Sequence, residues 1–148
     1  NIPIHICRIF NTYGPRMRKN DGRAIPNFIT QALKNESITV YGEGTQTRSF
    51  CYIDDLIDGI YLLSQSKVHG PINLGNPNEV KIIDIAKEII KLTESKSKIV
   101  YGPLPEDDPK VRRPDIENAK RLLNWKPKID LQQGLEVIIK WFSDELTR

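Results

Sequence analysis

The order of apolar and polar positions along the chain predicts a mixed arrangement of strands and helices. Short, nearly continuous apolar runs are typical of strands inside a sheet, and they occur at residues 4–10, 38–42, 48–53, 71–77 and 98–103. Apolar residues at the three- and four-residue spacing of one helix face occur within residues 24–34, 56–63 and 82–90. Because strands and helices are mixed throughout, the predicted fold class is α/β.

Aspartates mark the expected starts of three helices, because an aspartate at the N-cap accepts a hydrogen bond from the first turn. Asp54 or Asp55 is the expected N-cap of the helix that follows residue 53. The buried face of that helix is expected to contain Leu56, Ile57, Ile60, Tyr61 and Leu63. Asp115 and Asp130 are the expected N-caps of the last two helices, with Gln133 as a capping-box partner of Asp130.

Composition and charge fit one soluble domain and favour neither a nucleic acid nor a membrane as partner. The 148 residues are enough for one core. The formal net charge is only +3, with 22 basic and 19 acidic residues interspersed. No apolar run is long enough to span a bilayer, and no secretory leader is visible. Cys7 and Cys51 lie in strand-like runs without CxxC spacing, which predicts buried, reduced thiols and a cytoplasmic location.

Several common catalytic motifs are absent from this sequence. The chain contains no Walker A sequence, no GxGxxG, no GxSxG and no HExxH. Its two histidines, His5 and His69, are far apart in the sequence, and no metal site is expected from them. The chain also begins without Met inside a predicted strand, which suggests a fragment of a longer protein.

Arginines follow turns in three parts of the chain. They are Arg16, Arg18 and Arg23 after Gly14-Pro15, Arg48 after the glycine-rich turn 42–47, and Arg112 and Arg113 near the end of the proline-rich loop 103–114. A guanidinium suits bidentate contact with phosphate oxygens, and loops at strand ends are where α/β sheets bind ligands. For any single arginine, a solvated surface cation is the better interpretation. Three such loops together favour a site for an anionic ligand, where Tyr41 could stack on a base or pack in the core.

Five segments resemble sequence motifs of a known family, and they occur in the same order. They are RIFNTYGPRM, NDGRAIPNFITQAL, VYGEGTQTRSFCYIDD, INLGNP and DDPKVRRPDIENAKRLLNWKP. Over essentially the whole chain, they resemble the C-terminal half of extended short-chain dehydrogenase/reductases that act on nucleotide sugars. The D-D-P-x-x-R-x-P-D pattern in the last segment is more selective and resembles UDP-glucuronate decarboxylases. The related dTDP-glucose 4,6-dehydratases and UDP-glucose 4-epimerases usually carry different residues there.

The resemblance implies the C-terminal part of a Rossmann-like NAD-binding fold plus a small sugar-nucleotide-binding lobe, occupying residues 1–148. The N-terminal half of such a protein would carry the GxxGxxG turn for NAD and the catalytic Tyr-x-x-x-Lys pair. Both lie outside this chain, so the resemblance implies no catalytic residue here and an inactive fragment. It further implies NAD as cofactor, a UDP-sugar as ligand and a homodimeric full-length enzyme.

Positions that match the family motifs define the candidate site residues. For NAD they are Thr12, Arg18 and Arg23, and for the substrate they are Asn11, Asn27, Phe28, Tyr41, Gln46, Arg48 and Arg112. The resemblance places Tyr41 beside the uracil, Gln46 and Arg48 at the diphosphate, and Arg112 at the diphosphate or the sugar carboxylate. Arg48 and Arg112 are expected to be exposed, with little effect on stability. Arg8, within the first strand, is given no ligand role.

The implied reaction is decarboxylation of UDP-glucuronate to UDP-xylose through a 4-keto sugar, a lyase reaction of nucleotide-sugar metabolism. A dTDP-glucose 4,6-dehydratase or another NAD-dependent nucleotide-sugar epimerase or dehydratase is the alternative within the family. A non-catalytic nucleotide-binding fragment is the alternative from a different class.

Overall fold

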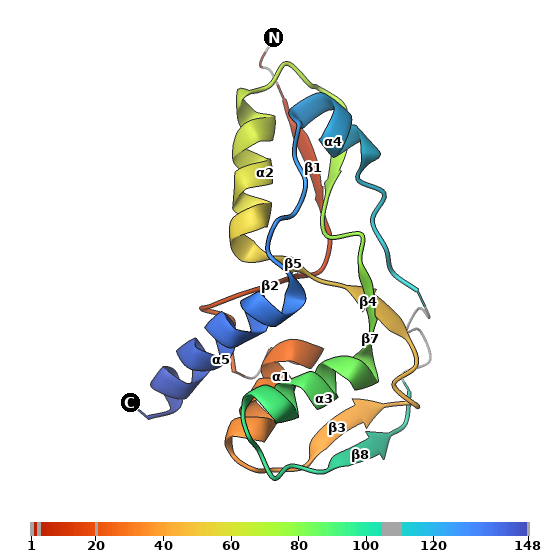
Figure 1. Ribbon diagram of the computed structural model, residues 1–148. Helices are drawn as coiled ribbons and strands as arrows, with labels where there is room; N and C mark the ends of the chain where they lie inside the picture. The colour runs from red at the N-terminus through yellow and green to blue at the C-terminus, as the bar shows by residue number, and fades with distance from the viewer. Residues whose placement is uncertain (1, 3, 20, 105–110, 148) are drawn as a thin grey trace. The chain divides into compact units, whose positions relative to one another are not determined.

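The computed structural model describes residues 2, 4–19, 21–104 and 111–147, and its elements follow one another in mixed order (Figure 1). The strands are β1 (Ile6–Ile9), β2 (Thr12–Tyr13), β3 (Ile38–Tyr41), β4 (Thr47–Ser49), β5 (Cys51–Tyr52), β6 (Pro71–Leu74), β7 (Glu79–Lys81) and β8 (Ile99–Gly102). The helices are α1 (Ala24–Leu33), α2 (Ile53–Gln65), α3 (Ile82–Leu92), α4 (Glu117–Leu123) and α5 (Leu131–Leu146). The prediction of an α/β fold is confirmed. Half of the predicted loop 103–114, residues 105–110, lies outside the described residues.

The chain forms two compact units, and each is built from three separate segments. Unit 1 contains Asn1–Tyr13, Ser49–Glu79 and Arg113–Leu131. Unit 2 contains Gly14–Arg48, Val80–Arg112 and Gln132–Arg148. Within the described residues, no helix combines the length and the apolar character needed to cross a membrane.

In unit 1, β1 and β6 pair as a parallel sheet, with Ile6 opposite Pro71. Both strands lie inside apolar runs that the sequence predicted as strands, at residues 4–10 and 71–77. Helices α2 and α4 pack against these strands, and α2 runs alongside β1 in Figure 1. The resulting core contains Cys51, Leu56, Leu63, Ile72, Leu74, Ile116, Ala119, Leu123 and Trp125.

The other face of the β1–β6 sheet is uncovered in the described chain. Cys7 packs against the core, so its neighbours Ile6 and Arg8 lie on the opposite face. Both are exposed, Ile6 by 48%. Among the described residues, β6 is also the only strand that pairs with β1. Because parallel sheets in soluble proteins are normally covered on both faces, this sheet is incomplete as a buried element.

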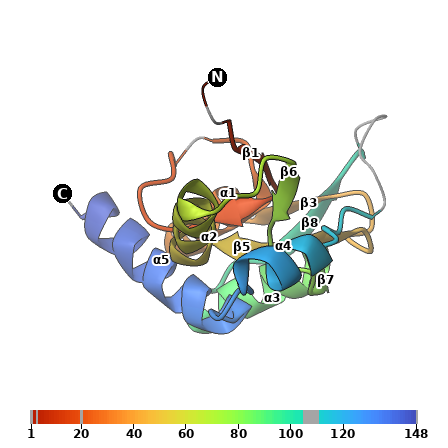
Figure 2. The ribbon, with the colours of Figure 1, turned by 90° about the horizontal axis from the view of Figure 1, so that it is seen from above.

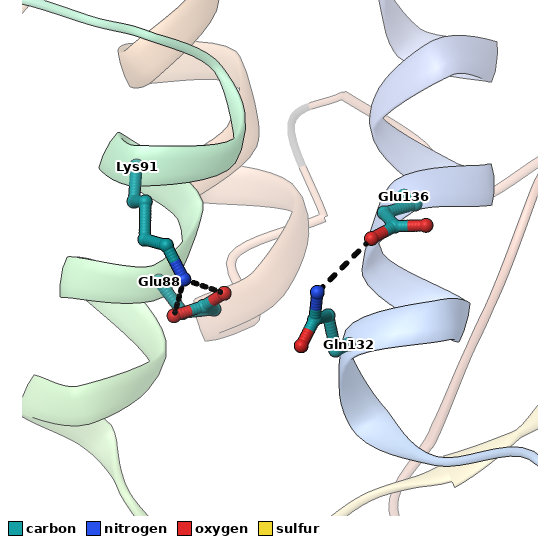
Figure 3. Close-up of polar contacts among 4 residues, drawn as sticks. All are labelled: Glu88, Lys91, Gln132 and Glu136. Carbon is teal, nitrogen blue, oxygen red and sulfur yellow. Dashed lines mark hydrogen bonds and ion pairs between the residues drawn. The ribbon is translucent and has the colours of Figure 1, made fainter.

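In unit 2, α1 and α3 pack against each other and against β3, which pairs in parallel with β8, and the two strands run side by side in Figures 1 and 2. Ile38 and Val40 point toward the helices and are fully buried. Helices α3 and α5 each carry a polar pair between two side chains of the same helix (Figure 3). Lys91 Nζ lies 3.2 Å from Glu88 Oε1 on α3. On α5, Gln132 Nε2 donates to Glu136 Oε1 at 3.2 Å.

The start of α2 differs from the prediction. Residues 48–53 do not form one strand. Strand β4 ends at Ser49, β5 contains only Cys51 and Tyr52, and α2 begins at Ile53. Tyr52 is the N-cap and makes no side-chain capping bond, so the prediction of Asp54 or Asp55 as N-cap is wrong. Both aspartates lie in the first turn. The Asp55 carboxylate instead accepts hydrogen bonds from the backbone of Lys128 and Ile129, far away in the sequence.

The buried face of α2 is also rotated relative to the prediction. Leu56 and Leu63 are buried as predicted, but Ile57 and Tyr61 are 54% and 64% exposed. Gly59 explains the rotation, because a Cβ there would lie 2.9 Å from Trp125 Cε2 and 3.0 Å from Leu74 Cδ1. The helix therefore makes its closest approach to the core through Gly59.

The last two helices begin close to their predicted starts. Helix α4 begins at Glu117 with Ile116 as its N-cap, so the prediction of Asp115 as N-cap is wrong by one residue. The Asp115 carboxylate still accepts the Glu117 N–H at 2.9 Å, at the first residue of the helix. Helix α5 begins at Leu131, directly after Asp130, and the capping box with Gln133 stays a prediction.

Candidate functional site

The candidate site in unit 2 is built around the turn that follows β3, residues 41–46. Gly42 and Gly44 have φ angles of 63° and 70°, in the left-handed region that favours glycine. A Cβ on Gly44 would lie 2.8 Å from Val40 Cγ1 and 2.9 Å from Ile83 Cβ, so a larger residue does not fit. Gln46 Nε2 donates to the Tyr41 carbonyl at 2.9 Å and closes the turn on itself.

Two carbonyl groups of this turn also cap helix α3. Ile83 N–H donates to the Gly44 carbonyl at 3.0 Å, and Ile82 N–H donates to the Gln46 carbonyl at 3.1 Å. The first amides of a helix have no partner within it, and the N-cap Lys81 makes no side-chain capping bond. The turn therefore supplies partners that the helix itself lacks, and its conformation is tied to the amino end of α3.

Tyr41 lies at the end of β3 with its side chain 49% exposed. A Cβ on Gly102 would lie 3.2 Å from Tyr41 Cδ1, so the ring rests over this glycine of the neighbouring strand β8. The ring is thereby supported on one side, while about half of the side chain remains accessible. An aromatic ring held in this way is suited to stacking on a planar base.

The two predicted diphosphate arginines differ in burial. Arg112 is exposed, as predicted. Arg48 is only 8% exposed, so the prediction of a surface cation is wrong for this residue. Its Nη1 donates to the Thr47 carbonyl at 2.7 Å. Arg48 lies inside strand β4, which begins one residue earlier at Thr47.

The loop of residues 14–23 carries the predicted cofactor arginines. Arg18 is exposed, and Arg23 Nε forms an ion pair with Asp21 Oδ1 at 2.7 Å. Arg16 has a left-handed φ of 69°, which is uncommon for a residue with a long side chain. The loop is attached to unit 2 by Lys19 Nζ, which donates to the Glu145 carbonyl at 2.6 Å.

Helix α1 carries two predicted substrate residues near its start. Asn27 is half-buried, and its backbone N–H bonds to the Arg23 carbonyl at 3.2 Å. Phe28 is buried among the core residues of α1. Any contact of Phe28 with a ligand would therefore involve its backbone more readily than its ring.

Asn11 and Thr12 lie in unit 1, directly after β1. The Asn11 carbonyl accepts the Cys51 N–H at 2.9 Å, and the Thr12 hydroxyl donates to the Phe10 carbonyl at 2.9 Å. These bonds fix the backbone at the carboxyl end of a parallel strand, where α/β sheets bind ligands. The other predicted site residues belong to unit 2, and the structure brings Tyr41 and Gln46 into direct contact there.

Three groups with shifted pKa values in unit 1 have structural rather than chemical roles. Burial raises the pKa of the Cys51 thiol to about 12, with a further contribution from Asp55. Burial also raises the pKa of Cys7. Tyr13 has a pKa raised by burial, and its hydroxyl donates to the Leu131 carbonyl at 3.3 Å. The thiols are therefore protonated and poorly nucleophilic at neutral pH.

Sequence reasoning did not connect two features that the structure brings together. His5 and His69 are stacked with ring centroids 5.6 Å apart, and His5 Nδ1 lies 2.7 Å from the Val68 carbonyl. The dependence of α3 on the turn at 41–46 was also missed. Its signal in the sequence is the absence of Ser, Thr, Asp or Asn at position 81, where the helix needs a cap.

Comparisons with known proteins give one consistent result. Residues 1–75 match the model of the NAD dependent epimerase/dehydratase family. The chain is 49% identical over 145 residues to UDP-glucuronic acid decarboxylase 1 of Danio rerio, covering 98% of this chain and 35% of that protein. It is 49% identical over 146 residues to UDP-glucuronic acid decarboxylase 4 of Arabidopsis thaliana, covering 99% of this chain and 33% of that protein.

Solved structures agree with this result at the level of the fold. UDP-glucuronic acid 4-epimerase from Bacillus cereus, in complex with UDP-glucuronic acid and NAD, superimposes with a TM-score of 0.89 at 34% identity. The match covers 97% of this chain and 46% of the epimerase. The chain thus spans about a third of the curated relatives and less than half of this solved chain.

Proposed function

Because the chain belongs to the NAD-dependent epimerase/dehydratase family, we propose that it is the sugar-nucleotide-binding portion of a UDP-glucuronate decarboxylase. The observation that carries the proposal is 49% identity, over 98% of the chain, to a protein with that activity. The D-D-P-x-x-R-x-P-D pattern of residues 107–115 supports it.

The turn after β3 supports a nucleotide ligand by the groups it presents. Glycine backbone, the half-exposed ring of Tyr41 and the guanidinium of Arg48 occur within eight residues of one another. Glycine lets a ligand approach the backbone closely, an aromatic ring can stack on uracil, and a guanidinium suits a diphosphate. Arg112 is the proposed contact for the sugar carboxylate, since it is exposed and always charged.

The proposed reaction uses NAD, which would accept a hydride from C4 of the sugar and later return it. The resulting 4-ketone lies β to the carboxylate and accepts the electron pair that remains when CO2 leaves. The contribution of this chain is to bind and orient the substrate. Thr12, Arg18 and Arg23 are its proposed cofactor contacts, and Arg23 would exchange its ion pair with Asp21 for a contact with the cofactor.

The uncovered β1–β6 sheet supports the proposal that this chain is one part of a larger fold. An N-terminal NAD-binding half would add strands beside β1 and helices over the face that carries Ile6 and Arg8. That half would also supply the catalytic Tyr-x-x-x-Lys pair. The proposal includes a homodimeric parent enzyme in the cytoplasm, the latter supported by the free thiols of Cys7 and Cys51.

An epimerase acting on the same sugar is the second candidate, because UDP-glucuronic acid 4-epimerase shares the fold at 34% identity. Both reactions pass through a 4-ketone and differ in whether the carboxylate is lost.

Incubating the full-length protein with UDP-glucuronate and NAD separates the two candidates, with products identified by chromatography and mass spectrometry. The proposal predicts CO2 and UDP-xylose without net formation of NADH. Conversion to the C4 epimer with retention of the carboxylate would favour the second candidate. The chain of 148 residues alone is expected neither to retain NAD nor to release CO2. Decarboxylation by this chain alone would contradict the assignment of the catalytic pair to another part of the protein.

A further inference from the structure

The side chain of Gln46 forms a hydrogen bond within the turn of residues 41–46, which is the ligand turn of the proposed function. Its Nε2 donates to the Tyr41 carbonyl at 2.9 Å, so one amide N–H points back across the turn. The acceptor is the carbonyl of the residue whose ring is proposed to meet the base. The next residue, Gly42, has a left-handed φ of 63°. The peptide between Tyr41 and Gly42 is therefore held at both ends, with its carbonyl accepting from Gln46 and its N–H donating to the Gly102 carbonyl at 2.8 Å. The bond from Gln46 is the one that a side-chain substitution can remove.

We propose that Gln46 is a positioning residue for the nucleobase end of the ligand, acting through Tyr41 rather than by contact with the diphosphate. The inference rests on the proposed function, because it assumes a uridine nucleotide beside Tyr41. It replaces the role that the family resemblance assigned to Gln46. In this role, loss of the side chain frees the turn and misplaces the ring.

The backbone of the same turn also bonds to the start of α3. The conformation of the turn and the start of the helix therefore depend on each other. The Gly44 and Gln46 carbonyls accept the first amides of α3, at Ile83 and Ile82. A Cβ on Gly44 would lie 3.3 Å from the Ile83 nitrogen, so turn and helix are in close contact. When the bond from Gln46 to Tyr41 is lost, these two amide bonds are expected to open more often.

Truncated ligands distinguish positioning from direct contact. In the full-length protein, Gln46→Ala is titrated with uridine, UMP and UDP. A lost neutral hydrogen bond corresponds to roughly a two- to tenfold loss in affinity. Positioning through Tyr41 predicts that this loss is already complete with uridine and equal for all three ligands. A loss that appears only with UDP, with uridine unaffected, would show a direct diphosphate contact and overturn the inference.

Gln31→Ala is the matched control, because Gln31 also bonds to the backbone of β3. Its Oε1 accepts the Thr39 N–H at 3.2 Å, on the same strand but away from the turn. This variant is expected to lower stability without changing affinity for uridine. If it lowers that affinity as much as Gln46→Ala does, the effect is one of general stability and the inference is wrong.

Hydrogen exchange provides a measurement that needs no ligand. In Gln46→Ala, amides at the start of α3, Ile82 and Ile83, are expected to exchange roughly two- to tenfold faster, and in Gln31→Ala they are not. Unchanged exchange at these amides overturns the inference even if UDP binds. If the wild-type protein binds none of the three ligands, the proposed function fails. In that case faster exchange shows that Gln46 holds the turn, and only its role toward a base is refuted.

Discussion

Replacing Asp55 by Ala should be one of the most destabilising single changes in unit 1. The side chain is buried, with 3% of the residue exposed, and lies in the first turn of α2. Its Oδ2 accepts the backbone N–H groups of Lys128 and Ile129, each at 2.9 Å. The Asp55 carbonyl also accepts Trp125 Nε1–H at 2.9 Å. One residue of α2 thus holds the segment between α4 and α5.

The magnitude follows from the two bonds that the carboxylate makes. A hydrogen bond to a charged group contributes about 1.5–3 kcal/mol, and a buried donor left without a partner costs a similar amount. Losing both bonds should therefore lower the free energy of unfolding by about 3–6 kcal/mol. That is a large share of the 5–15 kcal/mol that is typical of a whole domain. Asp55→Asn retains an acceptor oxygen without the charge and should cost less, about 1–2 kcal/mol.

Urea denaturation followed by tryptophan fluorescence measures this effect, because Trp125 is buried in the same core. Asp54→Ala is the matched control, since Asp54 is the preceding residue in the same turn and is exposed. It removes the same charge from the amino end of α2 and should cost below about 1 kcal/mol. If the two Ala variants lose equal stability, Asp55 is acting only through the helix dipole and its bonds to the distant backbone contribute nothing.

Three further predictions concern the ligand turn, the arginines and the buried thiol. Arg48→Ala and Arg112→Ala should each weaken UDP-glucuronate binding by the full-length protein roughly ten- to hundredfold in a titration, with partial rescue by Lys. Only Arg48→Ala should also lower Tm, because Arg48 is buried and Arg112 is exposed. Unchanged affinity in both variants would show that neither arginine binds the ligand. Gly44→Ala should lower Tm, since its Cβ would lie within 3.0 Å of two side chains at a φ of 70°, and a wild-type Tm would refute the fit described here. The Cys51 thiol, whose pKa burial raises from an ordinary value of 9.0 to about 12, should resist alkylation at pH 8.5. Above pH 9 the unfolded thiol loses its proton first, so stability should fall toward pH 12, and Cys51→Val should reduce that slope.

The elements that the sequence predicted best are those whose signal is local. The apolar spacing of residues 24–34 predicted α1, found at Ala24–Leu33, because one helix face repeats within a few residues. Strands β1 and β6 were each predicted from an apolar run that suits a sheet interior. In both cases, the residues that decide the structure are neighbours in the sequence.

The errors occurred where a distant segment decides the outcome. Asp55 has the sequence context of an N-cap, but the backbone at residues 128 and 129 takes its carboxylate, and α2 begins earlier. Gly59 gave no apolar signal, yet its lack of a side chain lets Trp125 approach and turns Tyr61 outward. No local pattern contains these partners.

The candidate site was predicted in composition more readily than in geometry. The glycines and the ring of Tyr41 were singled out because residue type alone indicates close approach and stacking. The burial of Arg48 depends on how the chain packs around β4, and the role of Gln46 depends on the direction of one amide group across a turn. Both are properties of tertiary structure that residue type and spacing do not determine.

Strand β1 has the sequence of a buried strand, but the described chain covers only one of its faces. Its apolar character is typical of a strand covered on both faces, yet Ile6 and Arg8 are exposed and one strand edge is unpaired among the described residues. Under the proposed function, the NAD-binding half covers that face and buries Ile6. Arg8 would then be buried as well, and a buried guanidinium is stable only beside a carboxylate or several acceptors. Arg8 has no proposed role in the ligand site. Its role would instead be at the junction with the covering layer, which must present an acidic or carbonyl group opposite it.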